Sequence, residues 1–144
     1  MIVVDASVVV TALADDGPDG DLARERLRGE RLAAPHLIDL EATSAWLRMV
    51  AAGDLDARRA ELAITDLLNL RLDRVPHGPL VPRCWELRAS LTVHDAAYIA
   101  LAEALESTLV TAQGGLATAP GSRCTIEVLS SVPECACVVS DSTK

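Results

Sequence analysis

The sequence predicts an α/β domain in which helices cover a mainly parallel sheet. Three observations predict this class. Short β-branched runs alternate with longer helical stretches, hydrophobic residues make up 50% of the chain, and Gly, Pro and Asp gather at the breaks. The length of 144 residues is that of one domain with its own core. We expect this domain to span residues 1–132 and a tail without clear periodicity to span residues 133–144.

Five short runs are predicted to be strands, because each is rich in apolar or β-branched residues and is bounded by polar or turn-forming ones. The first, Ile2 to Val4, is entirely apolar, as in a strand buried on both faces. The expected strands span residues 2–4, 31–34, 71–75, 108–111 and 125–129.

The stretches between the runs are predicted to be helices, since apolar residues recur there at helical spacing and Gly or Pro bounds them. In one of them Leu37, Leu40, Leu47, Val50 and Ala51 are expected to form the apolar face. The Gly114-Gly115 pair predicts a turn. The expected helices span residues 7–14, 21–28, 37–52, 55–70, 81–90 and 95–105.

Composition narrows the classes of function. The chain carries 21 acidic and 13 basic residues, a net charge of −8, which argues against a broad basic face for nucleic acid. Aromatic residues make up only 2%, too few for a stacking platform. No apolar run is long enough to span a membrane and no basic leader precedes the first one, so a cytoplasmic protein is expected. The four cysteines lack zinc spacing and are expected to be reduced thiols.

Three acidic residues lie where an ordinary surface charge is not expected. Asp5 follows the first strand, at the edge of a parallel sheet where ligands bind, although an aspartate there is equally suited to cap the next helix. Glu41 is expected within an apolar helical stripe, where an unpaired carboxylate is costly. Asp95 opens another apolar stripe, and it too has the alternative of a cap. Asp39 and Glu103, by contrast, are expected to be solvated charges.

Together, these three carboxylates indicate a metal site. Carboxylate oxygens without His or Cys companions suit Mg²⁺, with Mn²⁺ as a possible substitute. Such sites carry out phosphoryl or phosphodiester chemistry, in which the ion activates water and neutralises developing charge. The sequence therefore indicates a metal-dependent hydrolase acting on a phosphate ester.

Four segments carry a resemblance to a known family. They read MIVVDAS, PHLIDLEATSAWLR, LTVHDAAYIALAEAL and TLVTAQGGLATAPG, in that order over roughly residues 1–129. They are similar to the corresponding segments of PIN-domain proteins, specifically VapC-type toxins. The resemblance implies a three-layer α/β/α PIN-like fold, a homodimer and a cognate VapB-type antitoxin. It also implies an endoribonuclease toxin that hydrolyses RNA with a magnesium-activated water and leaves a 5′-phosphate and a 3′-hydroxyl.

The family pattern assigns residues to the site. Its three acids match Asp5, Glu41 and Asp95 as catalytic residues and metal ligands, and its hydroxyl residues match Ser7 and Thr111. A fourth acid is usual after the second of these hydroxyls, but this chain carries Gln113 there. Glutamine offers a neutral carbonyl oxygen and an amide donor but no charge.

Two other functions stay open on the sequence alone. The missing fourth charge is compatible with a catalytically weakened PIN module that mainly binds antitoxin or RNA. A phosphatase or phosphoacceptor with Asp5 as nucleophile is the third hypothesis, but Ser7 stands where such a site needs a second acid. Arg88 is a candidate RNA contact, whereas Trp85 and Tyr98 are expected in the core.

Overall fold

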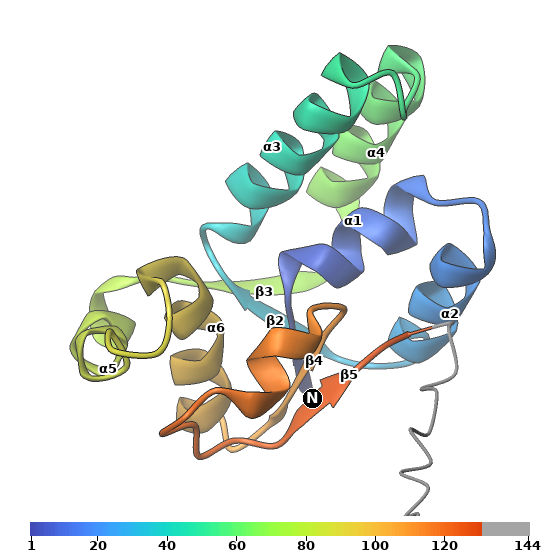
Figure 1. The fold of residues 1–144 in the computed structure, drawn as a ribbon. Coiled ribbons are helices and arrows are strands. Elements are labelled where there is room, and N and C mark those ends of the chain that lie inside the picture. The colour runs from blue at the N-terminus through green and yellow to red at the C-terminus, as the bar shows by residue number, and fades with distance from the viewer. Residues whose placement is uncertain (131–144) are drawn as a thin grey trace, which may run out of the picture.

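The computed structural model describes residues 1–130 and contains a five-stranded sheet (Figure 1). Its strands are β1 (Ile2–Val4), β2 (Leu32–Pro35), β3 (Leu72–Val75), β4 (Thr108–Thr111) and β5 (Ile126–Val128). They lie in the order β3-β2-β1-β4-β5, and every neighbouring pair is parallel. The predicted parallel sheet is therefore confirmed.

Six α-helices and two short 3₁₀ segments connect these strands within the described part of the chain. The helices are α1 (Ala6–Ala14), α2 (Pro18–Leu27), α3 (Ile38–Ala51), α4 (Ala57–Asn69), α5 (Val81–Glu86) and α6 (Val93–Ala104). The 3₁₀ segments are η1 (Gly78–Leu80) and η2 (Gly114–Thr118), and η2 replaces the turn predicted there. The helix predicted over residues 81–90 ends early, because the amides of Arg88 and Ser90 bond three residues back in tight turns.

The helices form two layers, one on each face of the sheet (Figure 1). Right-handed crossovers place α1 to α4 on one face, because β1, β2 and β3 follow one another in a single direction. The return from β3 to β4 places α5 and α6 on the other face, where α6 packs on β1, β2 and β4. The three-layer α/β/α prediction is confirmed. The strand order reverses between β1 and β4, so a ligand crevice is expected at their carboxyl ends.

Trp46 is the largest side chain in a core that is mostly aliphatic. It projects from α3, is fully buried, and its Nε1–H donates to the carbonyl oxygen of Val10 on α1 at 3.3 Å. Because α3 carries Glu41, this contact also fixes the helix that presents one of the candidate site residues.

The predicted apolar face of α3 is only partly right, since Leu37 and Val50 pack against the core but the other members do not. Its buried residues are Ile38, Ala42 and Trp46, whereas Leu40 and Leu47 are 78% and 68% exposed. Both groups of residues recur at helical spacing. The helix face that contains Trp46 is the one that packs inward, because a buried tryptophan removes more apolar surface from water than a leucine does. The leucines therefore form an outward stripe.

Two acids expected to be solvated are instead paired. Asp39 accepts two hydrogen bonds from the Arg74 guanidinium, at 2.7 and 2.9 Å. Glu103 accepts two from Arg83, at 2.7 and 3.1 Å, and one from the Arg123 backbone amide at 2.8 Å. Burial raises the pKa of Glu103, but these hydrogen bonds outweigh it and hold the pKa below its usual range. Both acids tie distant segments together.

The two predicted core aromatics behave differently. Tyr98 is fully buried, as predicted, whereas Trp85 is 64% exposed. The short α5 presents Trp85 outward, and the Arg88 guanidinium lies 4.4 Å from the centroid of its ring. The prediction of a buried Trp85 is therefore wrong.

No helix within residues 1–130 is long and apolar enough to cross a membrane. Cys84 and Cys124 are free thiols, as predicted. The other two cysteines and the tail predicted over residues 133–144 lie outside the described residues.

Candidate functional site

Asp5 is the most buried of the three candidate acids, with 1% of its surface exposed. Its backbone occupies the position before α1, but its side chain makes no capping hydrogen bond. Its Oδ2 atom instead accepts hydrogen bonds from Ser7 Oγ at 2.7 Å and from Thr111 Oγ1 at 2.8 Å. These contacts favour a functional carboxylate over a helix cap.

Two backbone amides orient the hydroxyl groups that hold Asp5. The Ala112 N–H donates to Ser7 Oγ at 3.0 Å, and the Gln113 N–H donates to Thr111 Oγ1 at 3.0 Å. Because each hydroxyl has one proton, accepting an amide leaves that proton free to point at Asp5. The segment after β4 therefore supports the site through its backbone, whatever side chain stands at position 113.

Glu41 brings a half-buried carboxylate from the first turn of α3. Its Oε1 atom is buried and has no hydrogen-bond partner within residues 1–130. Burial is the largest cause that raises the pKa of Glu41, and the charge of Asp5 raises it further. An unpaired buried carboxylate oxygen is costly, so this atom is suited to a ligand that would satisfy it.

Asp95 is the third residue of α6, and Thr92 rather than Asp95 caps this helix. The Thr92 Oγ1 atom accepts the Asp95 N–H at 3.2 Å. The Asp95 charge raises the pKa of both Asp5 and Glu41, which places its carboxylate in their electrostatic neighbourhood. Three carboxylates, one directly after β1, one on α3 and one on α6, thus repel one another at one edge of the sheet.

Asp5 shows how burial and hydrogen bonding oppose each other in this cluster. Burial is the largest effect and raises its pKa, the hydroxyls of Ser7 and Thr111 lower it, and Asp95 raises it again, with a net increase. A cation beside the cluster would reverse this balance and favour the ionised form.

The acidic cluster fits a hard divalent cation. Within residues 1–130, no three His, Cys, Asp or Glu side chains are placed to hold an ion by themselves. Mg²⁺, however, commonly takes only one or two protein carboxylates and completes its coordination with water and substrate oxygens. The unpartnered Oε1 of Glu41, beside Asp5 and Asp95, supplies oxygen donors of this kind. The residues present therefore fit Mg²⁺ or Mn²⁺.

Tyr98 is a site neighbour that the sequence did not reveal. Its buried hydroxyl faces Glu41 and lowers the pKa of that carboxyl as a hydrogen-bond donor, but the contact is too loose to satisfy either oxygen within residues 1–130. Burial and the charges of Glu41 and Asp5 raise the pKa of Tyr98 strongly, so the phenol stays protonated. The available signal was its spacing: Tyr98 follows Asp95 by three positions, on the same side of α6.

The side chains of the two remaining predicted residues, Gln113 and Arg88, make no hydrogen bond with the three acids within residues 1–130. Gln113 is exposed, and its side chain makes no hydrogen bond within residues 1–130. Arg88 donates to the Trp85 carbonyl oxygen at 2.9 Å and stacks on the Trp85 ring. Its role as an RNA contact stays a prediction.

Replacing Thr111 with valine should weaken divalent-ion binding about 10- to 100-fold, the usual effect of losing a group that orients a ligand. Valine has nearly the same shape, but Asp5 loses one of its two hydroxyl donors and the Gln113 amide loses its acceptor. Calorimetric titration with Mn²⁺ measures the change. Thr118→Val, which removes an exposed hydroxyl from η2, is the matched control. Equal Mn²⁺ affinities for the two variants would contradict the assigned role of Thr111.

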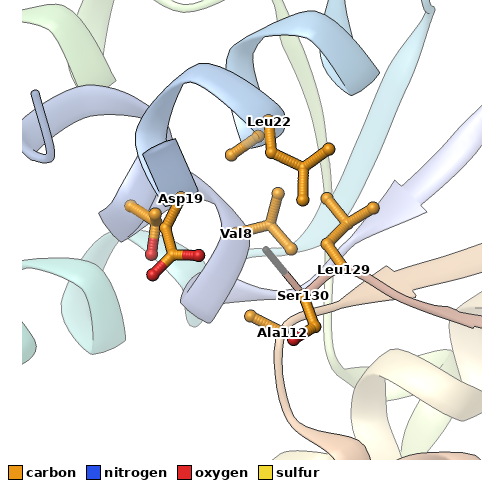
Figure 2. A pocket seen from close by; sticks show the side chains of 8 residues that line it. Val8, Asp19, Leu22, Ala112, Leu129 and Ser130 are labelled. Atoms are coloured by element: carbon orange, nitrogen blue, oxygen red, sulfur yellow. The ribbon is translucent and has the colours of Figure 1, made fainter. Parts of the chain in front are cut away.

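A separate cavity of about 200 Å³ lies between α1, α2 and the end of β5. Figure 2 shows Val8, Leu22 and Leu129 gathered there from these three segments. None of the three candidate acids lines it. It borders the site only through Ala112, whose amide bonds Ser7.

Comparison with known proteins adds a family pattern to this geometry. The model of the PIN domain family matches residues 2–120. VapC ribonuclease Mb0985 of Mycobacterium bovis is 41% identical over 129 residues, which are 90% of this chain and 98% of the relative. Ribonuclease VapC1 of Mycobacterium tuberculosis is 40% identical over 88% of this chain and 96% of its own length.

Two solved structures have a similar fold. PAE2754 from Pyrobaculum aerophilum superposes with a TM-score of 0.65 and 23% identity, over 88% of this chain and 83% of that one. VapBC2 from Rickettsia felis, bound to a DNA fragment from its promoter, gives 0.64 and 16%, over 89% and 98%. At these identities the likeness concerns the fold alone.

Proposed function

Because the chain belongs to the PIN domain family and covers nearly the full length of its VapC relatives, we propose that it is the endoribonuclease toxin of a toxin–antitoxin pair. We further propose that its activity depends on Mg²⁺ or Mn²⁺. The observation that carries this proposal is the convergence of Asp5, Glu41 and Asp95 at one end of the sheet, with Asp5 fixed by two hydroxyls.

Each residue of the cluster has a role in this proposal. Asp5, Glu41 and Asp95 would hold the ion together with water and substrate oxygens, and the ion would activate water and neutralise charge on the phosphate. Ser7 and Thr111 fix the orientation of Asp5 and partly offset the rise in its pKa that burial and Asp95 cause. The cluster lies at the carboxyl ends of β1 and β4, where an RNA phosphate would enter.

The test is cleavage of end-labelled RNA by the purified chain, with Mg²⁺, with Mn²⁺ and with EDTA. We expect cleavage with either ion, none with EDTA, and products that carry a 5′-phosphate and a 3′-hydroxyl. Equal cleavage in EDTA would refute the metal dependence, and inert protein with both ions would refute the nuclease assignment.

The alternative of a weakened binding module has no observation in its favour. The amide of Gln113 sustains the Asp5 network through the backbone, so the departure at position 113 leaves that network in place. The missing fourth charge is therefore expected to lower the affinity of the site for the ion.

Replacing Gln113 with aspartate should raise Mn²⁺ affinity by about tenfold, because a further carboxylate would face the ion. Gln113→Ala keeps the backbone amide and is the matched control, for which we expect the wild-type affinity. Calorimetry and the metal concentration needed for half-maximal cleavage measure the change. Unchanged affinity after Gln113→Asp would show that this position does not face the ion.

We also propose that the protein acts in the cytoplasm, forms a homodimer and binds a VapB-type antitoxin. The free thiols of Cys84 and Cys124 suit a reducing compartment. The α3–α4 hairpin exposes Leu47, Leu62 and Leu68, at 68%, 54% and 67%. Large exposed apolar side chains of this kind favour a protein partner.

A further inference from the structure

A groove of about 280 Å³ adjoins the acidic cluster between α3 and the start of α6. Five of its lining residues lie outside the cluster, and the sixth is Glu41, which belongs to both. The groove is therefore a side branch of the proposed active site. Its lining residues are Leu37, Leu40, Glu41, Ser44, Arg48 and His94.

Arg48 brings an unneutralised charge into this groove. Seven arginines of the described chain form salt bridges with a carboxylate, but Arg48 is not one of them. Its guanidinium donates to Ser44 Oγ at 2.9 Å, one helical turn nearer to Glu41. Since a turn of helix rises about 5 Å, this bond directs the cation back along α3 toward the site. Arg48 is exposed and has no salt bridge within residues 1–130, so its guanidinium is available to an anionic ligand that enters the groove.

His94 adds a second polar group on the opposite wall. It precedes Asp95 on α6, and its side chain is exposed. The other walls are apolar, and Leu40 is 78% exposed at the groove. One guanidinium, one imidazole and two leucines match a nucleotide unit, which has an anionic phosphate and an apolar ring face.

We propose that this groove binds the RNA strand beside the cleaved bond, with Arg48 holding an adjacent phosphate and Ser44 fixing the orientation of Arg48. Leu37 and Leu40 pack against the sugar or base of the same nucleotide. The inference rests on the proposed ribonuclease function, since it assigns the neighbouring subsite of the same substrate. This contact would let an acidic protein hold RNA through one arginine placed beside the site, without a broad basic face.

The test compares Arg48→Gln with Arg58→Gln and Arg71→Gln in the full chain. Both control arginines are exposed and without a salt bridge within residues 1–130, and neither lines this groove. Fluorescence anisotropy with a short single-stranded RNA in EDTA measures binding without cleavage. We expect Arg48→Gln to weaken RNA binding about tenfold and to reduce the salt slope of log K by about 0.7, the value for one phosphate contact. Arg48→Lys should keep the slope and lose part of the affinity, because lysine lacks the planar fork.

Further measurements separate this inference from the proposed function. The Mn²⁺ affinity of Arg48→Gln should equal that of wild type. In cleavage, Arg48→Gln should raise KM and leave kcat unchanged. If wild type cleaves RNA but Arg48→Gln binds RNA like the controls, the subsite is wrong and the nuclease stands. If wild type is inert but Arg48→Gln alone loses RNA binding, the subsite stands and the nuclease is wrong. Selective loss of binding to an oligoglutamate peptide, with RNA binding unchanged, would overturn the subsite in favour of an acidic protein segment.

Discussion

Asp5→Asn should reduce RNA cleavage at least about 100-fold while leaving the metal-free protein as stable as wild type or more so. The loss follows because an ion bound at the cluster is worth several kcal/mol to the transition state, and each 1.4 kcal/mol is a factor of ten. The fold should survive because the asparagine carbonyl oxygen can still accept the hydroxyl protons of Ser7 and Thr111. Removing a buried charge should add on the order of 1 kcal/mol to the free energy of unfolding.

The pH dependence of stability provides a control for the same variant. The folded-state pKa of Asp5 is raised above its ordinary value of 3.8, with burial as the largest cause. As pH rises between these two values, the unfolded chain releases its proton first, so the free energy of unfolding of the metal-free wild type falls. Asp5→Asn should lack this contribution, while Glu41 still supplies a similar one. Urea unfolding across this pH range measures it, and wild-type cleavage by the variant would refute the metal site.

Trp46→Ala should lower the free energy of unfolding by about 3–5 kcal/mol, the typical cost of emptying the volume of a buried tryptophan. The side chain is fully buried, and its loss also removes the donor to the Val10 carbonyl oxygen that joins α3 to α1. Urea denaturation followed by far-UV circular dichroism measures the midpoint and the slope m, and an unchanged m confirms that stability alone has changed.

Trp85→Ala is the matched control for this prediction. Trp85 is 64% exposed, and its main interaction is stacking with Arg88, so we expect a cost within about 1 kcal/mol. Equal costs for the two tryptophans would contradict the burial that the structure assigns to them. Trp46→Phe should fall between, because the smaller ring refills part of the space.

The sheet and the three acids were predictable because their signals are local. β-branched runs mark the strands, and Asp5 follows the first of them, so the rule for parallel sheets already places it at a crevice. The burial of Glu41 Oε1 was likewise expected from an acid in an apolar neighbourhood.

What the sequence could not supply depends on partners that are distant along the chain. Two apolar lines run along α3, and only packing against α1 decides that Trp46 lies inside and Leu40 outside. Asp39 pairs with Arg74, 35 positions away, and no residue near Asp39 in the sequence predicts this ion pair. The Tyr98 hydroxyl reaches the acids only because α6 crosses beneath β1.

The hydroxyl network around Asp5 also limits when a newly made chain can become active. Asp5 and Ser7 leave the ribosome early, whereas Thr111 follows Asp5 by 106 residues in the order of synthesis, and the two supporting amides follow Thr111. Until β4 pairs with β1, Asp5 has only one of its two hydroxyl donors. On the proposed function, the site is therefore incomplete through most of translation and is completed only when the last parts of the domain pack against the first.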